Sequence, residues 1–284
     1  MIAIVGATAT GKSSVAMCVA RAFEDVEIVS LDSMQVYRGL DIGTAKPTVD
    51  ERAEVRHHLL DIADLDEEMS VADIQRAARE AIADIDDRGA HALLVGGTGL
   101  YVRAVLDDLE LPGQFPDVRR ELEADVDTDA LQARLSSLDP DAAARIPPGN
   151  RRRVVRALEV TLGSGRPFSS YGPGLAVYPP STALQVGIEL SLDELDRRIE
   201  ARVRGMLDDG FVEEVAGLQG RPRSRTAAVA LGYDELEAHL AGDLTLDEAL
   251  AAVVTRTRQL ARRQRRWFRR DPRIVWTDSA SRAA

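Results

Sequence analysis

The chain has 284 residues, of which 45% are hydrophobic and 29% charged, and its formal net charge is −11 at pH 7. It lacks a hydrophobic run of about 18 residues and has one cysteine, Cys18, so neither a membrane span nor an intrachain disulfide is predicted. Because the first residues also lack the features of a signal peptide, we expect a cytoplasmic protein in which Cys18 is a small buried side chain.

The first predicted elements are a strand, a glycine-containing loop and a helix. Residues 1–5 and 12–23 predict the strand and the helix, and "GATATGKS" between them fits the pattern G-x-x-x-x-G-K-[ST]. Such a loop holds phosphate groups with its backbone N–H groups and with the N-terminus of the following helix. Lys12 adds a compact positive charge, and the Ser13 hydroxyl is a natural ligand for Mg²⁺. The predicted phosphate-binding residues are Gly6, Ala7, Thr8, Ala9, Thr10, Gly11, Lys12 and Ser13.

A second predicted strand, residues 26–31, ends at Asp32. In open α/β sheets, ligands bind outside the carboxyl ends of the strands. Asp32 is therefore predicted to be an acid on the Mg²⁺ side of the site or a general base, and the alternative is a residue that only forms a turn. His57 and His58 are adjacent and lack the i, i+4 spacing of a metal-binding pair, so we expect them to pack below the site.

Two further segments complete the predicted core. Residues 70–88 predict a helix with Ser70 as its N-cap. "HALLVGGTGLY", residues 91–101, predicts a strand, a glycine turn and a helix. Thr98 follows this strand and is predicted to point into the same crevice as Asp32, to cap the helix, or both. The pattern indicates an α/β fold, with a P-loop-type parallel sheet flanked by helices.

From residue 112 to residue 180 no strand is evident, and a strand is predicted again at 183–190. We therefore predict a mostly helical insertion at 116–183 within a catalytic core formed by 1–115 and 184–284. The remaining chain is predicted to be nearly all helical. A long helix from about residue 245 carries a hydrophobic stripe, Leu246, Leu250, Val253, Leu260 and Trp267, with the arginines mostly on its other faces.

Two basic clusters stand out in this acidic chain. Arg152, Arg153 and Arg156 lie at the start of a predicted helix in the insertion, and residues 256–273 contain nine arginines and one aspartate, a local charge of +8. This asymmetry is typical of a localised binding site for a polyanion. A solvated helix face is the alternative for each cluster.

Together these segments resemble the tRNA dimethylallyltransferases, also called tRNA isopentenyltransferases, from end to end. The most specific stretch is "DSMQVYRGLDIGTAKP", residues 32–47. The segments "HHLLD", "LLVGGTGLY", "RRVVRALEV", "GRPFS", "ALGYDEL" and "TRQLARRQRRWFRR" follow in the family's order. The resemblance implies transfer of a dimethylallyl group from dimethylallyl diphosphate to N6 of the adenosine at tRNA position 37. The products are N6-isopentenyladenosine and diphosphate.

The resemblance also implies roles for single residues. The phosphate loop and Mg²⁺, the expected cofactor, hold the diphosphate; Asp32 accepts the proton of the amine, and Thr98 helps to orient the reacting centre. The adenosine leaves its stack to reach the site. The expected partners are the anticodon stem-loop of tRNA and the diphosphate, with no membrane and no obligate protein partner. The residues implied to contact tRNA are Asp32, Ser33, Met34, Gln35, Arg119, Arg152, Arg153, Arg156, Arg263, Gln264 and Trp267.

This sequence departs from the family pattern at three positions. Arg56 replaces the usual proline before the two histidines, and Val229 stands where many members have an arginine that faces the diphosphate. Asp234 is acidic where a basic or neutral residue is common. The alternative functions are those of a P-loop small-molecule kinase, an adenylate isopentenyltransferase that modifies free nucleotides, and a non-catalytic RNA-binding protein.

Overall fold

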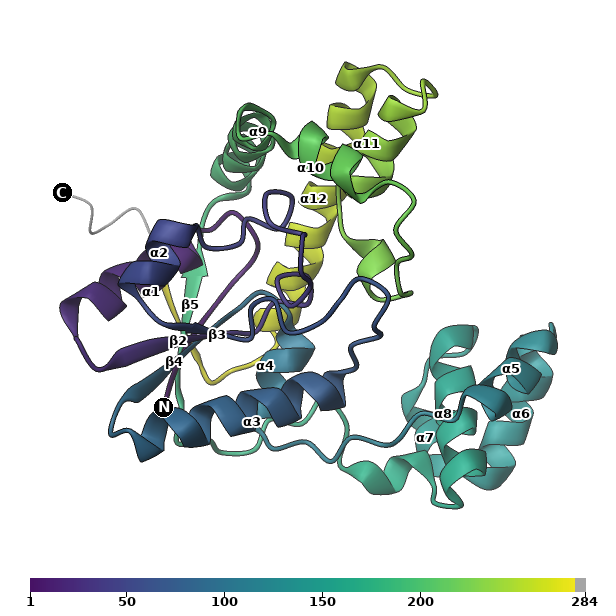
Figure 1. Ribbon diagram of the computed structural model, residues 1–284. Helices are drawn as coiled ribbons and strands as arrows, with labels where there is room; N and C mark the ends of the chain where they lie inside the picture. Colours follow the sequence, from purple (N-terminus) through teal and green to yellow (C-terminus); the bar gives the residue numbers. More distant parts are fainter. Residues whose placement is uncertain (279–284) are drawn as a thin grey trace. The chain divides into compact units, whose positions relative to one another are not determined.

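The structure is a computed structural model that describes residues 1–278 (Figure 1). The chain forms two compact units. Unit 1 consists of Met1–Asp107 and the chain from Pro180 onward, and unit 2 consists of Asp108–Pro179. Unit 2 begins and ends a few residues earlier than the insertion expected from the sequence.

Unit 1 contains a six-stranded sheet in which all strand pairs are parallel, in the order β3-β2-β4-β1-β5-β6. This confirms the predicted fold class, although two edge strands were not predicted. One edge strand has only two residues, and the other follows the arginine-rich segment. The strands are β1 (Ile2–Val5), β2 (Val26–Ser30), β3 (His57–His58), β4 (His91–Gly96), β5 (Leu184–Glu189) and β6 (Ile274–Asp278).

Helices cover both faces of this sheet because successive side chains of a strand point to opposite faces. Ile4 packs with α1 on one face, whereas Ala3 and Val5 join the larger core on the other face. That larger core includes side chains from α3, α4, α10, α11 and α12. The helices of unit 1 are α1 (Lys12–Ala22), α2 (Val49–Glu54), α3 (Val71–Asp87), α4 (Gly99–Leu106), α9 (Leu192–Asp208), α10 (Phe211–Leu218), α11 (Tyr233–Leu240) and α12 (Leu246–Phe268), with a short 3-10 helix at Ala227–Val229.

Capping residues fix where the long helices begin. The Ser70 hydroxyl accepts a hydrogen bond from the Asp73 backbone N–H at 3.2 Å, and the Asp73 carboxylate accepts one from the Ser70 N–H, so the predicted N-cap of α3 is confirmed. Thr245 and Glu248 form the same reciprocal arrangement at the start of α12. Each arrangement satisfies backbone donors that a helix start leaves without partners.

Unit 2 has a small hydrophobic core of its own, built from its four α-helices. Glu159, which is 1% exposed, lies within this unit and accepts hydrogen bonds from the Arg156 side chain and the Phe115 N–H. A buried carboxylate needs such partners to remain charged. The helices are α5 (Pro116–Ala124), α6 (Thr128–Leu138), α7 (Pro140–Arg145) and α8 (Arg151–Ser164), followed by a 3-10 helix at Phe168–Tyr171.

The expectation of a buried cysteine was wrong. Ala16, Met17 and Ala20 form the buried face of α1, and helical periodicity places Cys18 on the solvent side of that helix, where it is exposed. Within residues 1–278, none of the helices is both long and hydrophobic enough to cross a membrane.

Candidate active site

The phosphate loop connects β1 to α1 and packs against the C-terminal part of unit 1. Ala7 and Ala9 are buried in a cluster with residues of α9 and α12, including Ile199 and Ala261. Gly6 permits the close approach of this loop to β5, because a Cβ atom there would lie 2.6 Å from the Ile188 carbonyl oxygen. Distant parts of the chain therefore fix the shape of the loop.

Lys12 is the first residue of α1, and its amine is directed back toward the loop. Its Nζ donates a hydrogen bond to the Ala7 carbonyl oxygen at 2.7 Å. Burial and, to a smaller extent, the nearby Arg202 guanidinium lower the pKa of Lys12 to about 8, and Asp32 acts in the opposite direction. A bound anion would favour the charged form, so these surroundings suit an anionic ligand.

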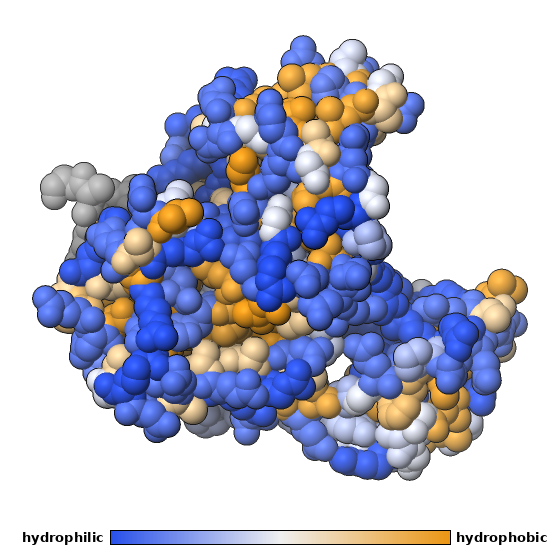
Figure 2. All heavy atoms as spheres, viewed as in Figure 1, coloured by the Kyte–Doolittle hydropathy of each residue, from blue (hydrophilic) through white to orange (hydrophobic). Residues whose placement is uncertain are grey.

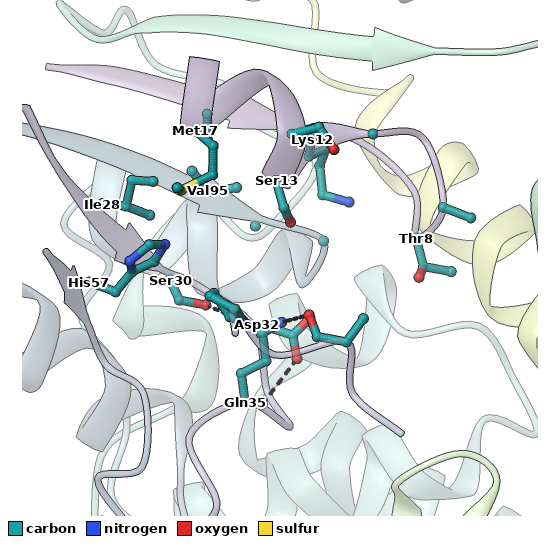
Figure 3. Close-up of a pocket in the computed structure, with 18 of the residues that line it drawn as sticks. Thr8, Lys12, Ser13, Met17, Ile28, Ser30, Asp32, Gln35, His57 and Val95 are labelled. Atoms are coloured by element: carbon teal, nitrogen blue, oxygen red, sulfur yellow. Dashed lines mark hydrogen bonds between the residues drawn. The ribbon is translucent and has the colours of Figure 1, made fainter. Parts of the chain in front are cut away.

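A cavity of about 180 Å³ lies beside this loop. In Figure 3, Lys12 and Ser13 project toward the cavity from the start of α1, and Asp32 and Gln35 lie across from them. His57 also lines this cavity and donates its Nδ1–H to the Val55 carbonyl oxygen at 2.7 Å. The cavity is therefore lined by polar groups suited to phosphate and to a cation.

A second and larger cavity, of about 460 Å³, adjoins the first. Its walls are more hydrophobic, and they include Met34, Leu100, Met206, Phe211, Val229, Leu231, Val253, Leu260 and Trp267. Figure 2 shows that this face of unit 1 is mainly hydrophilic, with hydrophobic residues in a recess. Five residues line both cavities: Thr8, Asp32, Gly97, Arg202 and Gln264. These five residues define what we call the junction.

The predicted hydrophobic stripe on α12 forms part of the wall of the second cavity. Val253, Leu260 and Trp267 lie on one face of the helix, and all three line the second cavity rather than only filling the core. Gln264, from the same face, accepts a hydrogen bond from the Thr8 N–H at 2.8 Å. The long helix thus forms one wall of the second cavity and also holds the phosphate loop.

Asp32 lies at the junction, two residues after the end of β2. Its Oδ1 accepts hydrogen bonds from the backbone N–H groups of Met34 at 2.8 Å and of Gln35 at 3.4 Å. Asp32 therefore forms a turn, and these hydrogen bonds fix the position of its carboxylate. Among the described residues Oδ2 accepts no hydrogen bond, so it remains able to accept a proton or to face a hydrated cation.

Thr98 and Ser33 line the second cavity close to one another. Thr98 occupies the N-cap position of α4, but its hydroxyl makes no capping hydrogen bond and donates instead to the Ser33 hydroxyl at 3.4 Å. Gln35 is held by its own chain. Its side-chain oxygen accepts from Ser30, and its amide nitrogen donates to the Thr44 and Ala45 carbonyls.

The three predicted residues near the end of α12 all line the second cavity, namely Arg263, Gln264 and Trp267. The arginine-rich segment as a whole, however, is mostly an intramolecular ion-pair network. Six of its nine arginines pair with carboxylates: Arg256 with Glu235, Arg258 with Glu200, Arg262 with Asp196, Arg265 and Arg269 with Glu189, and Arg273 with Asp107. The charges of these six arginines are therefore balanced within the chain, and a polyanion site along the whole segment stays a prediction. Within the described chain, Arg263, Arg266 and Arg270 have no ion-pair partner.

The basic residues predicted in unit 2 also divide into two groups. Arg156 pairs with Glu159 at 2.8 Å and donates to the carbonyls of Pro112 and Gly113, and Arg119 pairs with Glu123 at 2.8 Å. Arg152 and Arg153 are exposed, and in the part of the chain that the structure describes their side chains have no partner. These two remain available to an external anion.

Sequence reasoning missed Arg202, a residue of the junction. It donates from Nη1 to the Thr8 hydroxyl at 3.1 Å. A signal was present, because Arg202 lies seven residues after Leu195 and three after Ile199, both buried on α9. This spacing places it beside the buried face of the helix.

The residues present fit a Mg²⁺ ion only together with a phosphate ligand. The Ser13 hydroxyl and the Asp32 carboxylate line the same cavity, and both are oxygen donors of the kind that Mg²⁺ prefers. In the described residues there is no group of three or more His, Cys, Asp or Glu side chains that could hold a metal alone. Phosphate oxygens and water would have to complete the coordination.

The sequence matches a family model and is similar to known proteins. A family model described as "IPP transferase" matches residues 35–271. The chain is 52% identical to a tRNA dimethylallyltransferase of Salinispora tropica over 99% of this chain and 88% of that protein. It is 49% identical to one of Streptomyces coelicolor over 97% of this chain and 89% of that protein.

Solved structures similar to this chain are also transferases of this kind. A tRNA isopentenylpyrophosphate transferase of Bacillus halodurans is 41% identical, with a TM-score of 0.70, and the match covers 98% of this chain and 89% of that one. A eukaryotic dimethylallyltransferase described as acting on tRNA is 26% identical, with a TM-score of 0.81, over 98% of this chain and 73% of that one.

Proposed function

Since the chain belongs to the IPP transferase family and is a transferase that prenylates adenosine in tRNA, we propose that its prenyl donor is dimethylallyl diphosphate. The acceptor is N6 of the adenosine at position 37 in the anticodon stem-loop, and the enzyme acts in the cytoplasm. The observation that carries this proposal is the pair of adjoining cavities that meet at Asp32, the first with more polar walls and the second largely hydrophobic.

The first cavity binds the diphosphate. Backbone N–H groups of the phosphate loop and the N-terminus of α1 face its oxygens, and Lys12 neutralises charge that builds up as the bond to the allyl carbon breaks. Ser13 and Asp32 are the residues that would hold Mg²⁺. When bound, this ion adds positive charge that stabilises the leaving diphosphate.

The second cavity takes the dimethylallyl group and the adenine. Its hydrophobic walls suit both a short branched chain and a flat base. An adenine inside a stacked helix cannot reach an enclosed site, so the base must leave its stack before the reaction. Thr98 and Ser33, on the wall of this cavity, orient the reacting groups.

The reaction is a substitution at the allyl carbon. The N6 lone pair forms the new C–N bond, the C–O bond breaks, and diphosphate leaves with the electron pair. The proton from N6 passes to the Asp32 carboxylate, whose position is fixed by the turn that its Oδ1 forms.

The remaining arginines bind the nucleic acid. Arg152 and Arg153 on unit 2 are exposed and have no partner among the described residues, which suits contact with a phosphate backbone. Arg263 and Trp267 border the second cavity of unit 1 and suit contact with the nucleotides around the extruded base.

Mass spectrometry of nucleosides tests this function directly. The protein is incubated with Mg²⁺, dimethylallyl diphosphate and either an anticodon stem-loop or AMP, and the nucleosides are then analysed. We expect N6-isopentenyladenosine from the stem-loop at position 37 and none from AMP. Efficient modification of AMP would favour an adenylate isopentenyltransferase, and phosphoryl transfer in a parallel incubation with ATP would favour a kinase.

A further inference from the structure

Glu214, on α10, lines neither cavity of the described chain, yet its carboxylate binds the backbone of a loop that does. Oε2 accepts hydrogen bonds from the N–H groups of Asp41 at 3.0 Å and Ile42 at 2.7 Å. Oε1 accepts one from the Gly43 N–H at 3.1 Å and one from the Tyr233 hydroxyl at 2.6 Å. One carboxylate therefore satisfies three successive backbone donors of a segment that is neither helix nor strand.

The same loop packs tightly against α10 and α11. A Cβ atom at Gly43 would lie 2.7 Å from the Tyr233 ring and closer still to the Phe211 ring, so a larger residue would not fit. The two rings pack edge to face, with their centroids 5.2 Å apart. Burial and, to a smaller extent, the Glu214 carboxylate raise the pKa of Tyr233, so its hydroxyl stays protonated and acts as a hydrogen-bond donor. Charge and packing together hold residues 41–45, which we call the anchored loop.

The anchored loop forms part of the walls of both cavities. Thr44 lines the second cavity, and Ala45 lines the first. Their carbonyl oxygens accept hydrogen bonds from the side-chain amide nitrogen of Gln35, at 3.2 Å and 3.0 Å. The backbone N–H of Gln35 donates in turn to Oδ1 of Asp32 at 3.4 Å. A continuous series of hydrogen bonds therefore leads from Glu214 through the loop to the carboxylate at the junction.

On the basis of the proposed function, we propose that Glu214 is a positioning residue for the transfer of the dimethylallyl group. It holds the anchored loop and, through Gln35, the Asp32 carboxylate that accepts the proton from N6. A misplacement of about 1 Å at a reacting group can lower a rate about 10²-fold. Lys12 and Ser13, which bind the diphosphate, lie at the start of α1 and line only the first cavity. Glu214 therefore governs the transfer step rather than the binding of diphosphate.

The amide variant tests this role, because an amide has one acceptor oxygen where a carboxylate has two. In Glu214→Gln the NH₂ group would face two hydrogen-bond donors, and the loop would have to shift. Glu214→Asp keeps both acceptor oxygens on a shorter side chain. The matched control is Glu213→Gln, since Glu213 is the adjacent residue of α10 and is exposed.

Single-turnover rates are measured at saturating stem-loop and dimethylallyl diphosphate. Calorimetry with inorganic diphosphate gives the affinity and the number of competent sites. We expect Glu214→Gln to lower the rate per site by about 10²-fold with unchanged diphosphate affinity. Glu214→Asp should recover part of the rate, and Glu213→Gln should match the wild type. A rate per site close to that of the wild type, or an equal loss of rate and diphosphate affinity, would overturn the proposal.

Tyr233→Phe separates positioning from a loss of stability. It removes one hydrogen bond to Oε1 and leaves the three N–H groups of the loop paired with Glu214. The melting temperature should fall because the carboxylate loses a donor, whereas the rate per site should stay close to that of the wild type. If Tyr233→Phe slowed the reaction as much as Glu214→Gln, the effect would follow stability and the proposal would be wrong.

Amide hydrogen exchange tests the anchor without turnover. Exchange at residues 41–43 should be faster in Glu214→Gln than in the wild type and in Glu213→Gln, and equal exchange in all three would contradict the proposal. If the wild-type protein itself makes no isopentenyladenosine, the proposed function fails. The exchange comparison still decides whether Glu214 holds the loop.

Discussion

Lys12 is one of only two lysines in a chain with 36 basic residues, and the other, Lys46, has a purely structural environment. Lys46 is 7% exposed and pairs with Asp41 and Asp61. Lys12 has no carboxylate partner in the described chain and donates only to a carbonyl oxygen. Lys46 therefore stabilises the fold through its ion pairs, and of the two lysines Lys12 is the one available to a ligand.

Replacing Lys12 by Ala should remove stabilisation of the leaving diphosphate. We expect a loss on the order of 2–4 kcal/mol in transition-state stabilisation, which is about 30- to 900-fold in kcat. Stem-loop affinity should barely change, because the lysine lies in the polar cavity. Steady-state kinetics and a stem-loop binding titration measure the two effects. Near-normal turnover by a folded variant would contradict the role.

Asp32 has two possible contributions, as a base and as a group on the Mg²⁺ side, and its amide variant distinguishes them. Asp32→Asn keeps the side-chain oxygen that the turn requires but cannot accept a proton. As the loss of a general base, the change should lower kcat by roughly 10²–10⁴-fold while diphosphate binding persists. Kinetics over a Mg²⁺ titration are the measurement. Rescue at high Mg²⁺ would instead assign Asp32 mainly to the metal.

At the scale of helices and strands, α12 is tied to the sheet by charge as well as by packing. Glu189, at the end of β5, accepts hydrogen bonds from Arg265 at 2.7 Å and from Arg269 at 2.6 Å, both in or next to the last turn of α12. Burial would raise the pKa of Glu189, but these two guanidinium groups outweigh burial and lower it. The wall of the second cavity is thereby anchored near its C-terminal end.

This pairing predicts a pH-dependent contribution to stability. Because the folded-state pKa of Glu189 lies below its ordinary value of 4.5, the contribution is present above that value and is lost as the pH falls through the folded-state pKa. We expect Glu189→Gln to cost about 1–3 kcal/mol at pH 7 and much less in acid, as for hydrogen bonds to charged groups. Urea unfolding at both pH values tests this. The control is Glu24→Gln at an exposed site, and a difference that does not change with pH would contradict the assignment.

The sequence predicted the elements that depend on local patterns. Residue spacing predicted the phosphate loop and its flanking strand and helix, and the end of a hydrophobic run predicted the place of Asp32. The stripe on α12 was found, but periodicity shows only that a helix face is hydrophobic. It does not distinguish a face that packs in the core from one that lines a cavity, as Leu260 and Trp267 do.

The ion pairs and contacts that could not be predicted from the sequence join residues far apart in the chain. Arg258 and Arg262 pair with Glu200 and Asp196, about 60 positions earlier, and the arginine run alone does not reveal these partners. Arg202 was missed for a related reason, because its neighbour Thr8 comes from the other end of unit 1. Charge counted along the sequence therefore overestimated the charge available to a ligand.

At the scale of the whole molecule, the two units have separate hydrophobic cores and separate groups of arginines. The two cavities and the residues that we propose to act in catalysis belong to unit 1. The exposed Arg152 and Arg153 belong to unit 2, where Arg156 is engaged by Glu159. Contact with a nucleic acid backbone through unit 2 can therefore be removed without altering the reaction centre.

Replacing Arg152 and Arg153 together by Ser should weaken stem-loop binding and flatten its dependence on salt. Each lost phosphate contact should reduce the slope of log K against log salt by about 0.7–0.9. The rate of the chemical step in the preformed complex should stay close to wild type. Binding titrations at several salt concentrations test this, with the exposed Arg134→Ser of the same unit as control. An unchanged slope would remove these residues from the interface.

The position of unit 2 within the chain has a consequence for synthesis on the ribosome. β1 pairs with β4 on one side and with β5 on the other, and all of unit 2 is translated between β4 and β5. At a translation rate of roughly 5–20 residues per second, the edge of β1 that will pair with β5 stays unpaired for about 5–20 s. An unpaired strand edge can pair with other chains during this period.

The phosphate loop waits still longer, because Ala7 and Ala9 pack against residues of α9 and α12, and both helices are translated after β5. The loop is therefore translated long before the two helices that hold it. A nascent chain therefore cannot complete its site, and so cannot modify tRNA, until α12 has been translated.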